Sequence, residues 1–467
     1  MSQNQSVAEA LNEAPLGLFH LRAVITAGLG FFTDAYDLFI IGAALSVIKT
    51  QWHLTSTQVG WVGSATLIAT FVGAFLFGRL ADVYGRKKLY GWEAGIMAVG
   101  AILSAFAPNV TWLIIFRILM GVGIGGDYPT SAVIMSEFSN TKDRGKTVGM
   151  VFSMQALGTL VGPVVAITLL GAGIPDHIAW RLMLGLGAIP ALAVIYLRRT
   201  LPESPRYLAQ VRGDGAQAAK SIREYSDGLV TVDGAASRVN RMTFGQFITN
   251  PKYLLMLLGT AGTWFVFDYA YYGNTISTNA ILKLVSPHLS LIQSESLSLM
   301  IFAIAAVPGY ILAFLSIDRI GHKRLQLIGF IVMGLMFLGI GVIPGIVSHI
   351  VPFIILYGIS YFFAEFGPNT TTFVMAAEVF PVSMRTTGHG MSAGIAKIGA
   401  FIGVFIFPIL SHKLGLNGTL DITFVFALIG MLLTLVLPEP AKKSMESISG
   451  QDHASSAVTR TTTATGA

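Results

Sequence analysis

The sequence predicts an all-α membrane protein with twelve transmembrane helices, arranged as two six-helix bundles related by pseudo-symmetry. Of the 467 residues, 53% are hydrophobic and only 12% are charged, whereas about 25% of the residues of a soluble domain are charged. Apolar stretches of about 20 residues, the length that crosses a bilayer as a helix, recur along the chain. In addition, motifs of the first half recur in the second half at a near-constant spacing.

The first bundle is expected to occupy residues 20–199. Each of its six apolar stretches is long enough to cross the hydrocarbon core, and polar or Gly- and Pro-containing segments separate them. The stretches lie near 20–48, 58–80, 89–107, 111–138, 147–171 and 179–199.

The second bundle is expected to occupy residues 253–437 by the same criterion. Its apolar stretches lie near 253–282, 292–316, 325–347, 350–378, 388–411 and 418–437. Residues 200–252 form the predicted cytoplasmic linker. Residues 1–15 are polar and show no signal-peptide pattern, and residues 1–19 are expected to form a cytoplasmic N-terminal segment. Residues 438–467, rich in Ser, Thr and Ala, predict a disordered cytoplasmic tail.

Lys and Arg gather in alternate loops, those after the second, fourth and eighth apolar stretches, and in the linker. On the other side Lys49, Lys283 and Lys413 stand almost alone. Because positively charged loops remain in the cytoplasm, both termini are expected there, in a multi-pass protein of the plasma (inner) membrane. The net charge of +6 is thereby explained by topology, and we expect no nucleic-acid partner. The chain has no Cys, which excludes disulfides and thiolate metal sites.

An internal repeat relates the two halves. The segment 82–88 (DVYGRKK) recurs as 318–324 (DRIGHKR), 236 positions later, and the Pro-Glu pair at 202–203 recurs at 438–439 with the same offset. Such duplicated six-helix units place a substrate site between the halves, near the middle of the membrane.

A third repeated feature is a pair of charged residues at helix ends. Glu137 lies seven residues before Arg144, and Glu378 lies seven residues before Arg385. We expect these residues to form two gating pairs, Glu137 with Arg144 and Glu378 with Arg385.

The segment 78–88 (GRLADVYGRKK) resembles the loop signature of the major facilitator superfamily, and 202–206 (PESPR) resembles a segment of its sugar and phosphate members. The resemblance covers residues 20–440 and implies the fold of that superfamily. It also implies gating and topology roles for Asp82 and Arg86, but it does not indicate the substrate.

Five ionisable residues lie deep inside apolar stretches: Asp34, Asp37, Asp127, Asp268 and Lys397. A charged side chain at the bilayer centre costs about 2.5–3.5 kcal/mol even on the gentler insertion scale. Such groups must face one another or a polar cavity. They therefore predict a path for a solute or for protons, which is the property of a transporter.

The segment 121–129 (GVGIGGDYP) contains a G-x-G-x-x-G pattern, but a dinucleotide site needs a preceding strand and this pattern lies inside an apolar stretch. The glycines instead favour close approach of a neighbouring helix or a substrate, with Pro129 bending the helix beside Asp127. With the following 131–137 (SAVIMSE), the segment resembles the signature of the phosphate:proton symporters, although Thr130 replaces an expected Leu.

Trp264, Asp268 and Tyr272 follow an i, i+4, i+8 spacing and share one helix face. A carboxylate accepts a hydrogen bond from P–OH, while indole N–H and phenol O–H donate to P–O. Lys397 supplies a compact cation that can pair with Asp268 or attract an anion. A packing stripe and a structural salt bridge are the alternative interpretations, but the symporter subfamily has the same residues at these places.

Gln155, in the middle of the fifth stretch, and Asn369, next to the helix-breaking Pro368, match polar ligands of the phosphate symporters. Hydrogen bonds between helices are the alternative role for both. The expected anion site comprises Tyr128, Gln155, Trp264, Asp268, Tyr272, Asn369 and Lys397.

Asp34 and Asp37 are one helical turn apart, and two close carboxylates in a low dielectric do not both ionise easily. They predict a proton site, to which Asp127 contributes. Glu93 and Arg117 are expected to complete this charge network, although Arg117 also fits a purely structural role.

These observations lead to the hypothesis of a proton-coupled inorganic phosphate symporter that works by alternating access as a monomer in the lipid bilayer, with no catalytic residues, metal or cofactor. The alternative is a symporter of an organic or phospho-organic anion, such as an aromatic carboxylate or glycerophosphate. Glu365, where the subfamily commonly has a neutral amide, leaves that alternative open. A nutrient sensor needs a larger soluble domain than the linker of about 50 residues offers.

Overall fold

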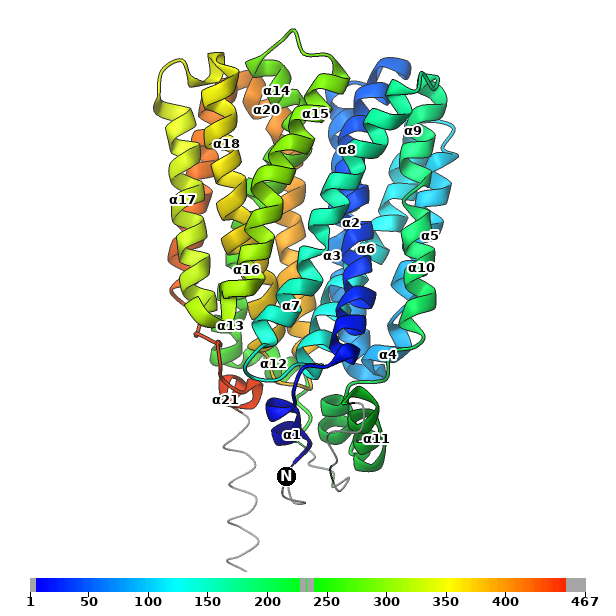
Figure 1. Cartoon of the computed structure of the whole chain (residues 1–467), viewed down its shortest axis with the longest axis vertical. Helices are drawn as coiled ribbons and strands as arrows, with labels where there is room; N and C mark the ends of the chain where they lie inside the picture. Colours follow the sequence, from blue (N-terminus) through cyan, green and yellow to red (C-terminus); the bar gives the residue numbers. More distant parts are fainter. Residues whose placement is uncertain (1–5, 227–231, 233–238, 451–467) are drawn as a thin grey trace, which may run out of the picture.

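A computed structural model of the chain describes residues 6–226, 232 and 239–450, which contain helices and no strand (Figure 1). Among these residues, nine helical stretches are long and apolar enough to cross a membrane. One of them, α20 (Arg385–Thr434), covers both the eleventh and the twelfth predicted span and is broken at Gly415, whose φ is 70°. The third and seventh predicted spans are α5 (Trp92–Ala105) and α13 (Pro251–Ile276). The predicted all-α membrane class is confirmed.

The first half of the chain forms one group of upright helices (Figure 1). The fifth predicted span is divided at Met154 and the sixth at residues 186–187, so each consists of two consecutive helices. The helices of this half are α2 (Leu18–Gln51), α3 (Ser56–Tyr84), α4 (Arg86–Leu89), α5, α6 (Val110–Phe138), α7 (Arg144–Ser153), α8 (Gln155–Gly171), α9 (Asp176–Gly185) and α10 (Ala188–Arg198).

The second half forms a second group beside the first (Figure 1). The predicted break at Pro368 is present: η4 (Glu365–Asn369) is a π-helical turn in which Gly367 has non-helical dihedral angles. The other helices of this half are α13, α14 (Thr278–Val285), α15 (Leu291–Ile301), η2 (Phe302–Ala306), α16 (Val307–Ile320), α17 (His322–Val342), η3 (Ile346–Ser348), α18 (Ile350–Ala364), α19 (Thr370–Glu378) and α20.

Short helices gather at one end of the molecule, which we call the terminal end, whereas α9 and α14 lie at the opposite end, the α14 end (Figure 1). The terminal helices are α1 (Val7–Glu13), η1 (Tyr207–Arg212), α11 (Gly215–Tyr225), α12 (Phe244–Thr249) and α21 (Met445–Ser449). The predicted disorder from residue 438 is wrong for 438–450, because Met445 and Ile448 are buried and anchor α21. Residues 451–467 lie outside the described part.

Equivalent turns in the two halves confirm the internal repeat. Gly85 and Gly321 have φ angles of 105° and 99°, which few residues other than glycine adopt. The amide of Lys87 donates to Glu203 at 3.2 Å, and the amide of Lys323 donates to Glu439 at 3.1 Å. Each Pro-Glu pair therefore caps the helix that follows the repeated turn in its own half.

The glycines of the G-x-G-x-x-G segment lie against neighbouring helices. A Cβ on Gly121 or Gly125 would come within 2.3 Å or 2.2 Å of a carbonyl oxygen of α3. A Cβ on Gly123 would come within 2.6 Å of the Glu93 carbonyl of α5. Of the two predicted roles, close approach of helices is therefore the one that the structure supports.

Gly125→Ala should destabilise the protein, although Ala is ordinarily the better helix former by about 1 kcal/mol. Its methyl group would overlap the carbonyl oxygen of Thr70, and overpacking typically costs about 1–3 kcal/mol. Gly95→Ala is the matched control, because its methyl group would have no heavy atom nearer than 4.0 Å. In detergent, the apparent melting temperature of Gly125→Ala should be clearly lower than that of Gly95→Ala. Equal stability would contradict the assigned packing role.

Candidate functional site

A buried ion pair joins two helices of the second half, α13 and α20. Lys397 Nζ on α20 is 2.7 Å from Asp268 Oδ2 on α13, and it donates a second hydrogen bond to Tyr272 OH at 3.1 Å. Asp268 is fully buried and Lys397 is 1% exposed. The expected contact between these two residues is therefore present, and each side chain compensates the other's charge in a low-dielectric setting.

Aromatic rings surround the ammonium group of Lys397. Its Nζ lies 4.3 Å from the ring centroid of Tyr272, 4.8 Å from that of Tyr128 and 6.0 Å from that of Trp264. Tyr128 comes from α6, so one wall of this cage belongs to the first half. Such rings attract a cation through their faces and exclude water. An anion that enters the cage would meet a positive charge and several hydrogen-bond donors.

A chain of hydrogen bonds extends from this cage across both halves. Tyr128 OH lies 3.5 Å from Tyr272 OH and accepts from Gln155 Nε2 at 3.2 Å. Gln155 Oε1 in turn accepts from Tyr310 OH at 3.3 Å. Asn369 Nδ2 then donates to Tyr310 OH at 2.8 Å and also to the carboxylate of Glu365.

The structure therefore brings together all seven residues of the expected anion site. Sequence reasoning missed Tyr310, which links Gln155 to Asn369. Glu365, which the sequence marked as unusual, is fully buried beside these neutral partners.

A second charge cluster lies in the first half. Arg198, at the end of α10, forms ion pairs with Asp127 and, at 2.9 Å, with Glu93, and its guanidinium lies 4.1 Å from the ring centroid of Tyr90. A Cβ on Gly30 of α2 would overlap Asp127 and Arg198, so this glycine admits the pair against α2. Sequence reasoning missed Arg198, because a basic residue in the last turn of a span is normally a topology signal.

Glu93 and Arg117, which were expected to complete the first-half charge network, lie in two different ion pairs, Glu93 with Arg198 and Arg117 with Asp37. Arg117 binds Asp37 at 3.3 Å and donates from Nε to the Val62 carbonyl at 3.0 Å. The Asp34–Asp37 pair is also unequal, because Asp37 has a cationic partner. Within the described residues, neither oxygen of Asp34 has a hydrogen-bond partner.

Asp34 nevertheless lies among charges. Its electrostatic neighbours are Asp127, Arg198, Lys397 and Asp37, and the side chain is fully buried. Ionising a buried carboxylate without a hydrogen-bonded cation is costly. Asp34 thus joins the first-half cluster to Lys397 and, unlike Asp37, Asp127 and Glu93, forms no ion pair within the described residues.

The residues expected to form gating pairs within each half are instead paired across the two halves. Glu137 of α6 binds Arg385 of α20 at 3.1 Å and also Arg86 at 3.1 Å. Glu378 of α19 binds Arg144 of α7, again at 3.1 Å. The prediction of pairs within each half is wrong, because a turn separates the two residues of each pair and directs the arginine across the interface.

Aspartates strengthen the same interface by capping helices of the opposite half. Asp82 of α3 accepts from the amide of Thr387 at 2.7 Å, in the first turn of α20. Asp318 of α16 accepts from the amide of Lys146 at 2.7 Å, in the first turn of α7. A carboxylate is favourable at a helix N-terminus, so these contacts hold the two halves together at the terminal end.

Helix α21 covers these ion pairs. Arg206 binds Glu446 of α21 and Asn12 of α1, the latter at 2.7 Å, and Arg144 donates to the Lys443 carbonyl at 2.8 Å. Burial alone would raise the pKa of Glu446, but the guanidinium groups of Arg206 and Arg385 lower it to about 2. Glu446 therefore stays ionised at neutral pH, which maintains its ion pair with Arg206.

Comparison with known proteins assigns the family. The model of the family described as sugar (and other) transporter matches residues 23–450. The chain belongs to this transporter family. A probable inorganic phosphate transporter 1-6 of Arabidopsis thaliana is 35% identical, with 96% of each chain covered. The inorganic phosphate transporter PHO84 of Saccharomyces cerevisiae is 33% identical, with 97% of this chain and 88% of the relative covered.

Solved structures place this transporter among proteins of the same fold. A structure of XylE, a proton:xylose symporter of the major facilitator superfamily, superposes with a TM-score of 0.78 at 19% identity, covering 93% of this chain and 99% of XylE. The inward-open conformation of XylE from E. coli gives a TM-score of 0.63 at 20% identity, with 92% and 99% covered. The two-bundle fold of the superfamily, predicted from the sequence, is confirmed, and the chain is a transporter rather than an enzyme.

Proposed function

We propose that this transporter is a proton-coupled inorganic phosphate symporter with its anion site at Lys397 and Asp268. The observation that carries the proposal is the enclosed Lys397–Asp268 pair, surrounded by Trp264, Tyr128 and Tyr272. Relatives that share about a third of their residues over nearly the full chain are named inorganic phosphate transporters. A site that offers a cation, several donors and one carboxylate acceptor suits an oxyanion that carries its own proton.

In this proposal phosphate separates Lys397 from Asp268. Its P–O oxygens take hydrogen bonds from Lys397, Trp264 and Tyr272, and its P–OH donates to Asp268. Tyr128, Gln155 and Asn369, joined through Tyr310, complete the site from both halves. Because residues of both halves surround the anion, binding favours closure of the halves around it.

Proton coupling is assigned to the acidic cluster beside the site. A proton on Asp34 removes a negative charge near Lys397 and Asp127, which raises the affinity for the anion. Loss of that proton on the other side restores repulsion and expels phosphate. Two groups of ion pairs determine the electrostatic potential at Asp34. One consists of Arg198 with Asp127 and Glu93, and the other of Arg117 with Asp37.

Alternating access in this proposal is a rocking of the two bundles, residues 20–199 and 253–437, around the site. The gate consists of the contacts between the halves at the terminal end, which are made by Asp82, Arg86, Glu137, Arg144, Glu378 and Arg385. Because the basic loops lie at the terminal end, that end and both termini are assigned to the cytoplasmic side of the plasma membrane. The transporter is proposed to act as a monomer.

An organic anion is the less favoured cargo. Lys397, Asp268, Tyr272 and Tyr128 are joined by contacts of 2.7–3.5 Å, so the enclosed site suits a small ion. A carboxylate substrate has no P–OH and makes no use of Asp268 as an acceptor. Glu365, beside Asn369, is the residue to examine if phosphate is not the cargo.

The test is uptake of labelled phosphate by the purified transporter in proteoliposomes under an inward proton gradient. We expect accumulation that collapses when a protonophore is added, and that excess glycerophosphate or benzoate does not inhibit. Accumulation insensitive to the protonophore would contradict proton coupling. No phosphate uptake by folded protein, or strong inhibition by an organic anion, would contradict the assignment of phosphate.

A further inference from the structure

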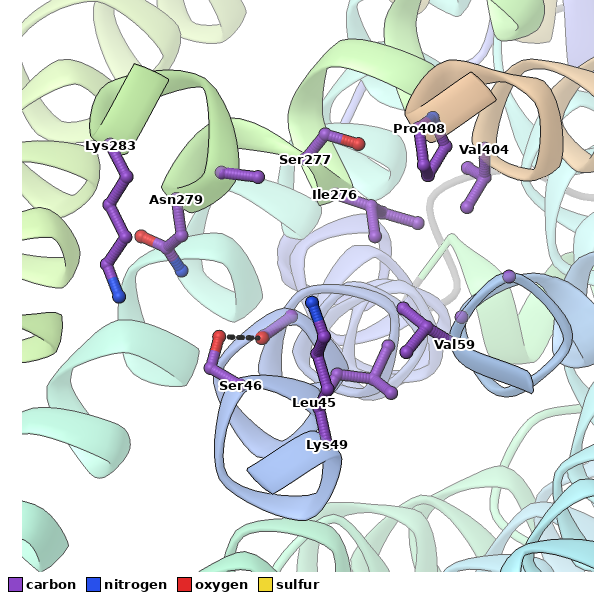
Figure 2. Close-up of a pocket in the computed structure, with 14 residues that line it drawn as sticks. Leu45, Ser46, Lys49, Val59, Ile276, Ser277, Asn279, Lys283, Val404 and Pro408 are labelled. Carbon is purple, nitrogen blue, oxygen red and sulfur yellow. Dashed lines mark hydrogen bonds between the residues drawn. The ribbon is translucent and has the colours of Figure 1, made fainter. Parts of the chain in front are cut away.

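A cavity of about 300 Å³ lies between the two halves at the α14 end (Figure 2). Its walls come from α2 and α3 of the first half and from α13, α14 and α20 of the second. Its polar lining consists of Ser46, Lys49, Ser277, Asn279 and Lys283. Figure 2 shows the ammonium end of Lys49 directed from α2 towards the helices of the second half.

The cavity lies further along the same helices, α13 and α20, that carry the central site. Ile276, in its floor, lies one helical turn beyond Tyr272 on α13, which is about 6 Å along the axis. Val404 lies seven residues beyond Lys397 on α20, or about 10 Å. A Cβ on Gly42 of α2 would come within 3.2 Å of the Ile276 carbonyl, so the halves approach closely at this floor. The cavity therefore lies within about two helical turns of Tyr272 and Lys397 along α13 and α20, and we call it the antechamber.

Positive charge is concentrated in this antechamber. Each half contributes one lysine, Lys49 and Lys283, at an end of the molecule that carries few basic residues. Both side chains are exposed, and the lysines that form salt bridges within the described residues are Lys220 and Lys397. Glu295 of α15 interacts electrostatically with Lys283, but it does not line the cavity and is held by Asn279.

We propose that this cavity is a second anion site, in which Lys49 and Lys283 hold inorganic phosphate before it reaches Lys397. The inference rests on the proposed function, because it takes the same anion as cargo. Two ammonium groups are strongly hydrated point charges, which suit a loosely held, hydrated dianion. A cleft of one charge sign with low-dielectric walls raises the local concentration of a counter-ion. Weak capture also lets the anion move on to the central site.

The first test is the KM of phosphate uptake in phosphatidylcholine proteoliposomes. We expect KM to rise about threefold in Lys49→Gln or Lys283→Gln and about tenfold in the double variant, at an unchanged maximal rate. In the wild type KM should also rise with ionic strength, since salt screens exposed charges, and the double variant should lose most of that dependence. Lys413→Gln is the matched control, because Lys413 lies at the same end outside this cavity.

The second test separates the antechamber from the central site. In Asp268→Asn, weak binding of inorganic phosphate, seen as broadening of its ³¹P resonance, should remain. The broadening should fall sharply when Lys49→Gln and Lys283→Gln are added, but not when Lys413→Gln is added.

Three results would overturn the second site while leaving phosphate transport intact. One is a double variant whose KM and salt dependence equal those of an active wild type. Another is an effect of the lysines that occurs only in vesicles with anionic lipids, which would mean that they act on lipid headgroups. The third is loss of all phosphate binding in Asp268→Asn. Failure of the wild type to take up phosphate would instead remove the proposed function itself.

Discussion

Asp268→Asn should weaken phosphate binding by about 10–100-fold, the equivalent of the 1.5–3 kcal/mol that a hydrogen bond to a charged group contributes. In the proposed site Asp268 accepts the proton-bearing oxygen of phosphate, and an amide that presents N–H in its place repels that P–OH. The measurement is phosphate affinity of the purified variant by titration calorimetry. Asp176→Asn, at the start of α9 and away from the site, is the control for generic loss of a carboxylate.

The sign of this effect distinguishes two roles of Asp268. If Asp268 were only the counter-ion of Lys397, its neutralisation would release the ammonium group and tighten anion binding. Tighter or unchanged binding would therefore contradict the acceptor role. The variant also leaves Lys397 as an uncompensated buried cation, which costs about 3–5 kcal/mol of stability. Its melting temperature must therefore be measured, and the better-balanced Asp268→Asn/Lys397→Gln variant should regain stability without regaining binding.

The sequence was sufficient to predict the architecture because bilayer thickness sets the length of each span. The apolar stretches correspond to helices, and the Pro-Glu pairs at 202–203 and 438–439 cap equivalent turns as the repeat predicted. The tail was misjudged because composition does not report that two apolar side chains, Met445 and Ile448, find a packing surface. Composition predicts disorder only where no such surface exists.

The candidate site was predictable where residues share a helix and obscure where they meet across helices. The common helix face of Trp264, Asp268 and Tyr272 follows from their spacing. A single Lys inside a membrane span is costly without an acidic partner, which pointed to Asp268. Arg198 and Tyr310 gave no comparable signal, since their roles depend on which helix faces them. The same limit explains the gate. Spacing along the chain places Glu137 near Arg144, but the packing of the two halves pairs it with Arg385.

Asp34→Asn should abolish proton-driven accumulation while leaving phosphate binding nearly intact. The amide mimics the protonated carboxylate in shape and charge, so the variant is held in the state with high anion affinity. Coupling between two sites is typically about 5–150-fold in affinity, and the variant should lose this proton-dependent difference in phosphate affinity, so that a proton gradient no longer drives accumulation. Phosphate exchange across vesicles without a proton gradient should continue, because exchange requires binding and closure but no proton release.

Asp37→Asn separates this role from the general effect of removing a buried carboxylate. Asp37 compensates Arg117, so its loss leaves a buried guanidinium unpaired and should lower stability by about 3–5 kcal/mol. Asp34 has no hydrogen-bonded partner, so its replacement should leave the melting temperature almost unchanged. Two carboxylates one turn apart on α2 are thus expected to differ in kind: one sustains the fold and the other carries the proton. Continued proton-driven accumulation by Asp34→Asn would move the proton site to Asp127 or Glu365.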